Sequence, residues 1–276
     1  RGMSKTLFVT DLDGTFLTSG GMRPYTEEIV RRARVRGTLI TCATARSWLT
    51  TTRLVGSTFG LPVVVHNGAA TVDPVTGRVL VRHLLPADTV RQILICCEEL
   101  GVPPMVHTLS GSAERTAWLP NPSSRHVSQY WEDRPGDIRS MPVSSWAHLP
   151  TETVINVSII SNRTQIDRMR TMLGEMADTE ILVRQDPRHP NTVWMEVAAC
   201  GVSKGSAVRE LANRLDADRI VAFGDDLNDL SLFAVADVSF AMEDAPYEVR
   251  ECATGVLESS SGESVARWLA SEIGLS

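Results

Sequence analysis

Short apolar runs alternate with helix-like segments along the first 70 residues of the chain. The apolar runs are rich in β-branched residues and end abruptly in polar residues; they occupy residues 6–10, 38–43 and 62–66. Helical patterns lie between them, at residues 24–36 and from about residue 45 onward. A continuous apolar run that a turn ends is typical of a strand buried in a parallel sheet. The alternation therefore predicts an α/β fold whose core is a doubly wound, Rossmann-like parallel sheet.

The pattern changes after about residue 70 and later returns. Residues 71–80 predict a hairpin, and residues 103–150 are rich in Pro, Ser, Trp and Arg. Beyond the hairpin we expect helices at residues 87–100 and 164–176, and strands at residues 154–160, 180–184 and 193–198. The α/β rhythm resumes with helices at residues 203–214 and 263–273 and strands at residues 220–223 and 238–241. We predict a core domain made of residues 1–83 and 190–276, with an α+β cap domain, residues 84–189, inserted between its two parts.

The composition argues against several classes of protein. With 43% hydrophobic and 22% charged residues, the chain is typical of a soluble globular protein. The net charge of −6 offers no basic surface for nucleic acid, and no apolar run reaches the roughly 18–20 residues that span a bilayer. Asp11 and Asp13 interrupt the first apolar stretch, which argues against a secretion signal. Five scattered cysteines without a C-x-x-C pair argue against a disulfide framework, so we expect a cytoplasmic protein, a monomer by default, without a nucleic-acid or membrane partner.

Aspartates follow two of the predicted core strands directly. They are Asp11 and Asp13 after the strand at 6–10, and Asp225 and Asp229 after the strand at 220–223. Ligands of open α/β sheets bind at the carboxyl ends of the strands, so these carboxylates converge if the two strands are neighbours. Carboxylates so close together repel one another at neutral pH unless a cation lies between them, and oxygen ligands with spare coordination positions suit Mg²⁺. The alternative is that each aspartate only caps the helix that follows it, but two such clusters favour the metal site.

Four motifs, taken in order, resemble those of the haloacid dehalogenase superfamily. The motifs are Asp11-Leu-Asp-Gly-Thr15, Thr44 after the second strand, Lys204 at the start of a helix, and Gly224-Asp-x-x-Asn-Asp229. The segments Ala241-Met-x-Asp-Ala245 and Gly-Val-Ser-Lys-Gly205 resemble the Cof-type, sugar-phosphatase branch of that superfamily. The resemblance implies a large α/β cap between the second and third motifs, which is where the composition changes.

The resemblance also implies a role for each matching aspartate. Asp11 is expected to be the nucleophile that forms an aspartyl-phosphate, and Asp13 the general acid and base. The carboxylates of Asp11 and Asp225, together with the backbone carbonyl of Asp13, are expected to bind Mg²⁺. Asp229 is expected to support the metal from beside it.

Four further residues are expected, from the resemblance, to hold the phosphate: Thr44, the backbone amide of Ala45, Lys204 and Asn228. Lys204 and Lys5 are the chain's lysines, while arginine supplies the rest of its 27 basic residues, so a lysine here indicates that a compact charge is wanted. The family usually has Gly where this chain has Ala45. Alanine is the smallest change available and should disturb the phosphate pocket little.

Further candidate site residues are suggested by their position along the chain. Arg46, Asn67 and Gly68 follow predicted strands and are candidates for substrate contacts or, equally, for a cap and a turn. Glu196 lies where the Cof-type branch keeps an acidic residue, and a hinge or surface role is the alternative. The tryptophans of the cap, Trp118, Trp131 and Trp146, are expected to form its core or to line a substrate-facing surface. Histidines 107, 126, 148 and 189 lack the spacing of metal ligands, so we expect them on the surface or in loops.

Three functions are compatible with these residues. The first is a Mg²⁺-dependent phosphatase that hydrolyses small phosphorylated metabolites, in particular sugar phosphates. The second is a phosphotransferase or phosphomutase of phosphomannomutase type, which would use the same aspartates and pass the phosphoryl group to a sugar. The third is a non-enzymatic binding module, which the loss of a catalytic aspartate would favour, and all four aspartates are present. We therefore expect a phosphatase whose partner is a small-molecule phosphate ester.

Overall fold

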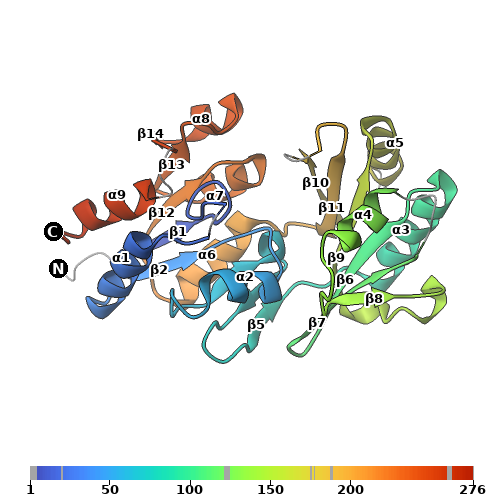
Figure 1. The fold of residues 1–276 in the computed structure, drawn as a ribbon, viewed down its shortest axis with the longest axis horizontal. Helices are drawn as coiled ribbons and strands as arrows, with labels where there is room; N and C mark the ends of the chain where they lie inside the picture. Colours follow the sequence, from blue (N-terminus) through green and yellow to red (C-terminus); the bar gives the residue numbers. More distant parts are fainter. Residues whose placement is uncertain are drawn as a thin grey trace. The chain divides into compact units, whose positions relative to one another are not determined.

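The computed structural model describes residues 5–19, 21–120, 125–174, 176, 178–186, 189–259 and 263–275. The chain divides into two compact units (Figure 1). The core unit comprises Arg1–Val81 and Ser203–Ser276, and the cap unit comprises Arg82–Val202. In the described residues, each helix is too short or too polar to cross a membrane.

The core unit is built on a parallel sheet of five strands in the order β14-β13-β12-β1-β2. The strands are β1 (Thr6–Thr10), β2 (Leu39–Cys42), β12 (Arg219–Gly224), β13 (Val238–Met242) and β14 (Gly255–Leu257). The helices are α1 (Pro24–Val35), α2 (Trp48–Val55), α6 (Lys204–Arg214), α7 (Leu230–Phe233), α8 (Tyr247–Cys252) and α9 (Ser264–Glu272). The predicted α/β fold with a parallel-sheet core is therefore confirmed.

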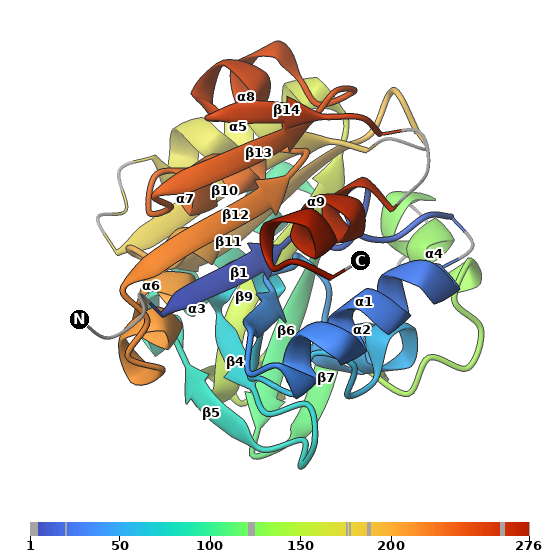
Figure 2. The ribbon, with the colours of Figure 1, turned by 90° about the vertical axis from the view of Figure 1, so that its left-hand side faces the viewer.

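Helices cover both faces of this sheet, because the strands are apolar on both sides. On one face Leu7 and Val9 of β1 pack in a buried cluster with Val208 and Leu211 of α6. On the other face Phe8 lies next to Trp268 of α9, with ring centroids 6.2 Å apart. Figure 2 shows α1 and α9 lying side by side over that second face.

The third predicted core strand does not join the parallel sheet. It is β3 (Val63–Val65), which forms a separate three-stranded sheet with β4 (Ala70–Val72) and β5 (Val79–Arg82) in the order β3-β4-β5. A single parallel bridge between Ala43 and Val64 links it to the end of β2. The reason is that β3 pairs antiparallel with β4 along its whole length. The predicted hairpin supplies that partner.

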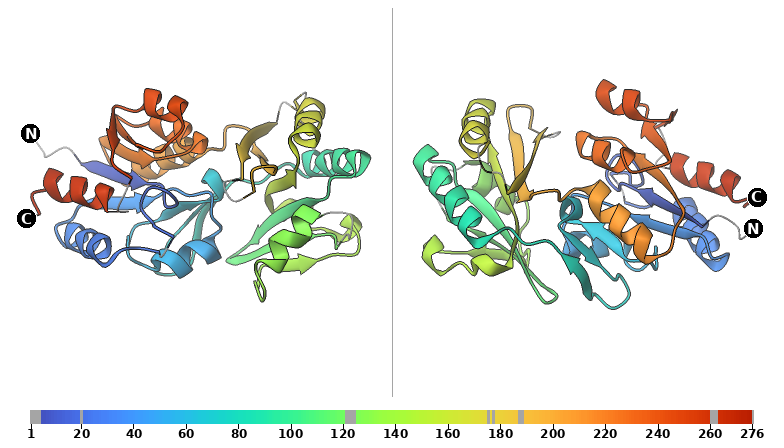
Figure 3. Two further views of the ribbon diagram at one scale, coloured as in Figure 1. Left: turned by 45° about the horizontal axis from the view of Figure 1, so that its top comes forward. Right: turned by 180° about the vertical axis from the view of Figure 1, so that it is seen from behind.

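The cap unit is a six-stranded sheet in the order β10-β11-β9-β6-β7-β8. Its strands are β6 (Pro104–Ser110), β7 (Ala113–Trp118), β8 (Ser140–Pro142), β9 (Val154–Ser161), β10 (Thr179–Gln185) and β11 (Val193–Ala199). The α-helices are α3 (Ala87–Leu100), α4 (Arg125–Glu132) and α5 (Arg163–Leu173), and the 3₁₀ turns are η2 (Trp146–His148) and η3 (Thr151–Thr153). Helices α3 and α5 lie on one face of this sheet (Figure 3), where their apolar side chains share a core with those of β9 and β11. Helix α4 packs on the other face, against Met105 and Ile160.

The boundaries of the two units differ from the predicted ones. We predicted that the core resumes at residue 190, but β11 pairs antiparallel with β9 and β10, so the cap unit extends to Val202. The physical reason is that Val193, Met195 and Val197 are buried in the apolar core of the cap. The cap also begins at Arg82 rather than at residue 84.

Candidate active site

The neighbouring strands β1 and β12 bring the two aspartate segments together. They pair in parallel with Thr10 opposite Phe223, and the backbone N–H of Asp11 donates to the carbonyl of Phe223 over 2.8 Å. Both strands are therefore in register where they end. The loops that follow them leave the sheet at the same edge, which is where open α/β sheets bind ligands.

Lys204 lies between two of the aspartates and is almost completely buried. Its side chain is 1% exposed, and its Nζ donates to Oδ1 of Asp11 over 2.5 Å and to Oδ1 of Asp229 over 2.7 Å. Lys204 begins helix α6, which Ser203 caps through a capping box with Ser206. The next residue is Gly205, and a Cβ there would lie 2.0 Å from the backbone oxygen of Ser231. This close contact with the start of α7 holds the first turn of α6 against the aspartate loop.

The loop after β12 is shaped by Asp229, which is fully buried. Oδ2 of Asp229 accepts hydrogen bonds from the backbone N–H groups of Asp225 and Asp226 over 2.9 and 3.1 Å. Asp229 ends the 3₁₀ turn η4 (Leu227–Asp229), while its other oxygen binds Lys204. Asp229 thus orders the backbone that presents Asp225 and neutralises part of the charge of Lys204.

Asp225 is held from the opposite side by the first loop. Its Oδ1 accepts a hydrogen bond from the hydroxyl of Thr15 over 2.8 Å. Gly14 has φ +79°, and a Cβ at this position would lie 2.1 Å from Oδ2 of Asp225. The motif therefore needs glycine at position 14 both for its positive φ and for the close approach of the carboxylate. Thr15 was not singled out as a site residue from the sequence, although it belongs to the same motif.

The carboxylates of Asp11, Asp225 and Asp229 each offer an oxygen within 4.8 Å of the others. Burial raises the pKa of Asp11 to about 7, the charges of Asp229 and Asp13 add to this rise, and Lys204 opposes it. Burial raises the pKa of Asp225 to about 8, with further contributions from Asp11 and Asp229. One lysine is thus too little positive charge for three carboxylates, of which Asp11 and Asp229 are buried and Asp225 is half-buried. This set of oxygen donors fits a divalent cation of the Mg²⁺ type.

Burial by itself would lower the pKa of Lys204, but the carboxylates of Asp11 and Asp229 more than offset that effect. The net result is a raised pKa, so Lys204 carries its positive charge throughout the physiological range. A charged lysine next to Asp11 is suited to neutralising an anionic group bound at that aspartate.

The carboxylate of Asp13 does not join the other three. Its two oxygens accept hydrogen bonds from Nε and Nη2 of Arg46 over 2.6 and 2.5 Å, and its side chain is 56% exposed. We expected four carboxylates in one small volume, and the structure brings three together. The reason is that the exposed side chain of Asp13 meets a guanidinium whose planar geometry matches both of its oxygens. Binding of a metal through the backbone carbonyl of Asp13 stays a prediction.

The remaining predicted phosphate and substrate residues form one connected group. Thr44 is buried; its carbonyl accepts from the backbone N–H of Asn67 over 3.0 Å, and its hydroxyl accepts from the backbone N–H of Arg46 over 3.1 Å. The Asn228 side-chain amide donates to Oδ1 of Asn67 over 2.9 Å. Asn67 has φ +53°, in the 3₁₀ turn η1 (His66–Gly68), and a Cβ at Gly68 would lie 2.1 Å from the carbonyl oxygen of Ser203. The turn therefore packs against the residue that caps the Lys204 helix, and Ala45 lies between Thr44 and Arg46 in the same loop.

Residues 8–269 of the chain match the haloacid dehalogenase-like hydrolase family. The chain belongs to this family. Its curated relatives include a putative phosphatase of Metamycoplasma hominis, 25% identical over 93% of this chain and 92% of that protein. Another is the 5-amino-6-(5-phospho-D-ribitylamino)uracil phosphatase YwtE of Bacillus subtilis, 25% identical over 94% of this chain and 95% of that protein. Among solved structures, a haloacid dehalogenase-like hydrolase from Bacteroides thetaiotaomicron has a TM-score of 0.80 at 18% identity, over 98% of this chain and 100% of that one.

The family match and the curated relatives make the protein a haloacid dehalogenase-like hydrolase of the Cof type and, as an enzyme, a phosphatase. The solved structure supports the fold. These matches agree with the order of the motifs read from the sequence, and they argue against a non-enzymatic binding module on this fold.

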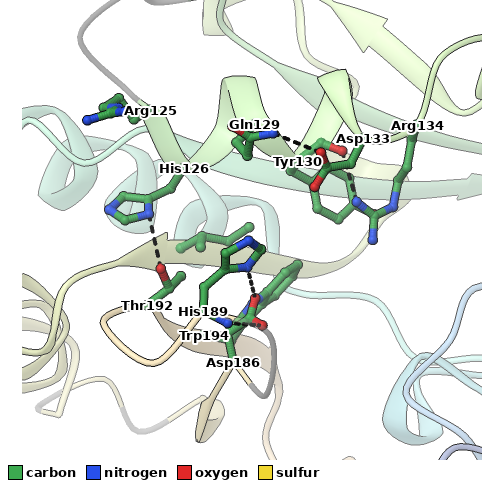
Figure 4. A pocket seen from close by; sticks show the side chains of 11 residues that line it. Arg125, His126, Gln129, Tyr130, Asp133, Arg134, Asp186, His189, Thr192 and Trp194 are labelled. Atoms are coloured by element: carbon green, nitrogen blue, oxygen red, sulfur yellow. Dashed lines mark hydrogen bonds and ion pairs between the residues drawn. The ribbon is translucent and has the colours of Figure 1, made fainter.

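The cap unit of this phosphatase has a cavity of about 370 Å³ (Figure 4). It is lined from α4, from Asp186 and from the segment 189–194, by residues that include His126, Tyr130, His189 and Trp194. Asp186 is buried and accepts a hydrogen bond from the indole N–H of Trp194 over 2.9 Å. Its other oxygen accepts from the backbone N–H of His189 over 3.2 Å. The cavity thus combines aromatic surface with hydrogen-bonding groups, and two histidines that we expected on the surface or in loops line it.

Other candidates in the cap have structural partners. Trp118 and Trp131 stack with ring centroids 5.7 Å apart in the cluster under α4, and Trp146 packs against the main core of the cap. Of the two alternatives predicted for these tryptophans, the structure agrees with the one in which they form the core of the cap. Glu196 lies on β11, where its Oε1 accepts from Nη2 of Arg184 over 3.3 Å. Glu196 is therefore part of the cap sheet rather than of the aspartate cluster.

Proposed function

We propose that this phosphatase hydrolyses small phosphorylated metabolites, sugar and polyol phosphates in particular, through an aspartyl-phosphate on Asp11 and with Mg²⁺. The observation that carries the proposal is the buried Asp11–Lys204–Asp229 arrangement, with Asp225 within reach of the same point. The name of the Bacillus subtilis relative specifies a phosphate ester on a ribityl group, which supports this substrate class.

The first step assigned to the chain's own residues is attack by Asp11. Lys204 binds Oδ1 of Asp11, which leaves Oδ2 to attack the phosphorus while the bond to the leaving oxygen breaks. Asp11 must be ionised for this attack, and the charge of Lys204 favours the ionised form. Lys204 then lies beside the phosphoryl group and offsets its negative charge.

Asp13 completes both half-reactions as acid and base. Its exposed carboxylate lies two residues after the nucleophile and is oriented by the guanidinium of Arg46. In its protonated form it would give a proton to the leaving alcohol. As a carboxylate it would then take a proton from the water that attacks the aspartyl-phosphate, which releases inorganic phosphate and restores Asp11.

Asp11 and Asp225 would hold the Mg²⁺. Asp229 would support the metal from beside it, by ordering the loop that carries Asp225. When bound, the ion supplies positive charge that offsets the three carboxylates and polarises a phosphate oxygen. Thr44, Ala45, Asn228 and Asn67 are proposed to contact the phosphate or the substrate around this point.

Removal of the metal tests the proposed hydrolysis. We expect phosphate release from a sugar monophosphate to require Mg²⁺, to stop with a chelator and to return when Mg²⁺ is restored in excess. Hydrolysis in water labelled with ¹⁸O should place the label in the released phosphate. Transfer to an added sugar without labelled phosphate would instead support the phosphotransferase alternative, and full activity in chelator would contradict the metal site.

The pH dependence of stability tests the metal site without using activity. Without metal, Asp11 and Asp225 keep their protons up to pH values of about 7 and 8, while the unfolded chain releases them near pH 4. The folded state then binds more protons than the unfolded state in this interval, so stability should fall as the pH rises from 5 to 8. Because Mg²⁺ replaces these protons, it should raise the melting temperature more at pH 8 than at pH 5.

Two adjacent aspartates provide matched variants for this measurement. Asp225→Asn should weaken both the fall with pH and the Mg²⁺ effect. Asp226→Asn should leave both as in the wild type, because the Asp226 carboxylate accepts from the backbone N–H of Leu227 and is not part of the cluster. Equal responses to Mg²⁺ at both pH values in the wild type would contradict the site.

A further inference from the structure

The core unit has a cavity of about 400 Å³ directly beside the proposed acid and base. Asp13 and Arg46 form part of its wall. The other lining residues include Thr18, Leu54, Asp244 and Ser259, which come from the first loop, from α2 and from the segments around β13 and β14. All of these residues belong to the core unit.

The position of Asp13 indicates which side of the reacting phosphorus the cavity is on. An acid that protonates the leaving oxygen must lie on the leaving-group side of the phosphorus, away from the attacking carboxylate. Asp13 is exposed and lines the cavity, whereas the three clustered carboxylates and Lys204 are not among the residues that line it. The cavity is therefore on the side where the alcohol departs.

The charges on its wall restrict what the cavity can hold. The guanidinium of Arg46 is paired with both oxygens of Asp13, so these two charges offset each other. Asp244 adds a second carboxylate; its Oδ1 accepts a hydrogen bond from the hydroxyl of Ser259. The ionisable wall thus has two carboxylates and one guanidinium. Its net charge is negative, and the hydroxyls of Thr18 and Ser259 add hydrogen-bonding capacity.

We infer that this core cavity is a leaving-group site that selects neutral, hydroxyl-bearing alcohols, with Asp244 as a specificity-determining residue. The inference rests on the proposed function and makes its substrate class narrower. Sugar and polyol monophosphates offer hydroxyls to Asp244 and to the two side-chain hydroxyls. Esters that have a carboxylate or a second phosphate in the leaving group bring a negative charge towards Asp244. They are therefore hydrolysed with a lower kcat/KM than the neutral esters.

Matched substrate pairs test the inference. Sorbitol 6-phosphate and 6-phosphogluconate are open chains that differ in having a terminal hydroxymethyl group or a terminal carboxylate, as do glycerol 1-phosphate and 3-phosphoglycerate. We expect the wild type to have the higher kcat/KM for the neutral member of each pair. Asp244→Asn keeps the size of the side chain and removes its charge. The ratio of kcat/KM for the neutral member to kcat/KM for the charged member should therefore narrow by roughly fivefold, the effect of two unit charges about 4 Å apart in water.

A nearby carboxylate outside the cavity provides the control. Glu248 lies exposed on α8 and does not line the cavity, so Glu248→Gln should leave the ratio unchanged. A wild type that prefers the charged members, or an Asp244→Asn variant that changes both members of each pair equally, would overturn the inference. Turnover of a generic aryl phosphate but of no member of either pair would overturn it as well.

This outcome is separable from failure of the proposed function. The nucleophile would be in doubt if Asp11→Asn kept its activity, whatever the substrate ratio. Narrowing of the ratio in Asp244→Asn alongside an inactive Asp11→Asn variant would support both proposals. An unchanged ratio alongside an inactive Asp11→Asn variant would reject only the leaving-group site.

Discussion

Replacing Asp11 with asparagine is expected to lower phosphate release by roughly 10⁴-fold or more, the scale seen when a catalytic nucleophile is removed. An amide oxygen is a far weaker nucleophile than a carboxylate, and the change also removes one of the three charges that would hold the metal. The asparagine Oδ1 can still accept the hydrogen bond from Lys204, so the variant should fold. Because burial raises the pKa of Asp11, the neutral asparagine should melt no lower than the wild type at pH 8.

The measurement is phosphate release at saturating Mg²⁺, together with the mass of acid-quenched enzyme during turnover. The wild type should gain the mass of one phosphoryl group, and Asp11→Asn should not. Asp13→Asn is the matched control: with a good leaving group it should still become phosphorylated, and it should accumulate this form because the base for the second step is lost. A phosphorylated Asp11→Asn variant would place the covalent intermediate on another residue.

Replacing Lys204 with methionine is expected to destabilise the protein by about 3–5 kcal/mol, as does removal of one partner from a buried ion pair. The lysine is 1% exposed and hydrogen-bonded to Asp11 and Asp229, so its loss leaves these two carboxylates buried without their shared counter-charge. Methionine is of similar length and should leave little empty space. Turnover should also fall by roughly 10²–10³-fold, because the charge beside the phosphoryl group is lost.

Urea unfolding in chelator measures the stability change, and the chain's other lysine provides the control. Lys5 is exposed, and its Nζ donates to the backbone carbonyl of Leu215, so Lys5→Met should cost less than about 1 kcal/mol. Adding Asp229→Asn to Lys204→Met should restore part of the stability, since one uncompensated charge is removed, but none of the activity. If Lys204→Met unfolded at the same urea concentration as the wild type, the buried ion pairs would not stabilise the fold.

Much of the core could be predicted because its signals are local. A strand buried on both faces must be apolar along its length, and residues 6–10 and 220–223 follow that rule. The polar residue that ends such a strand is then forced to the edge of the sheet. For this reason the positions of Asp11 and Asp225 could be anticipated, whereas Lys204 begins a helix and was expected from the family resemblance; the structure brings the three together.

The predictions that were wrong share one physical origin: the sequence pattern does not specify which strand pairs with which, or which side chains pair. Strands β3 and β11 are both apolar enough for the core sheet. In the structure each pairs antiparallel with strands outside that sheet, β3 with β4 and β11 with β9 and β10. An apolar run specifies burial and not the strand beside it. The same holds for side chains: nothing local in the sequence predicts that Arg46 pairs with Asp13, because the two residues are distant in the chain and meet only through the loops after β1 and β2.

The sequence by itself determined the α/β class, the strands of the core and the kinds of residue at its edge, because periodicity and residue chemistry are properties of short segments. Only the tertiary structure decided which carboxylates share a counter-charge, that the carboxylate of Asp13 lies apart from the other three, and that the wall beside it bears a net negative charge. Those properties depend on distances between groups far apart in the chain. Such distances are set by the pairing of strands and the packing of helices on them.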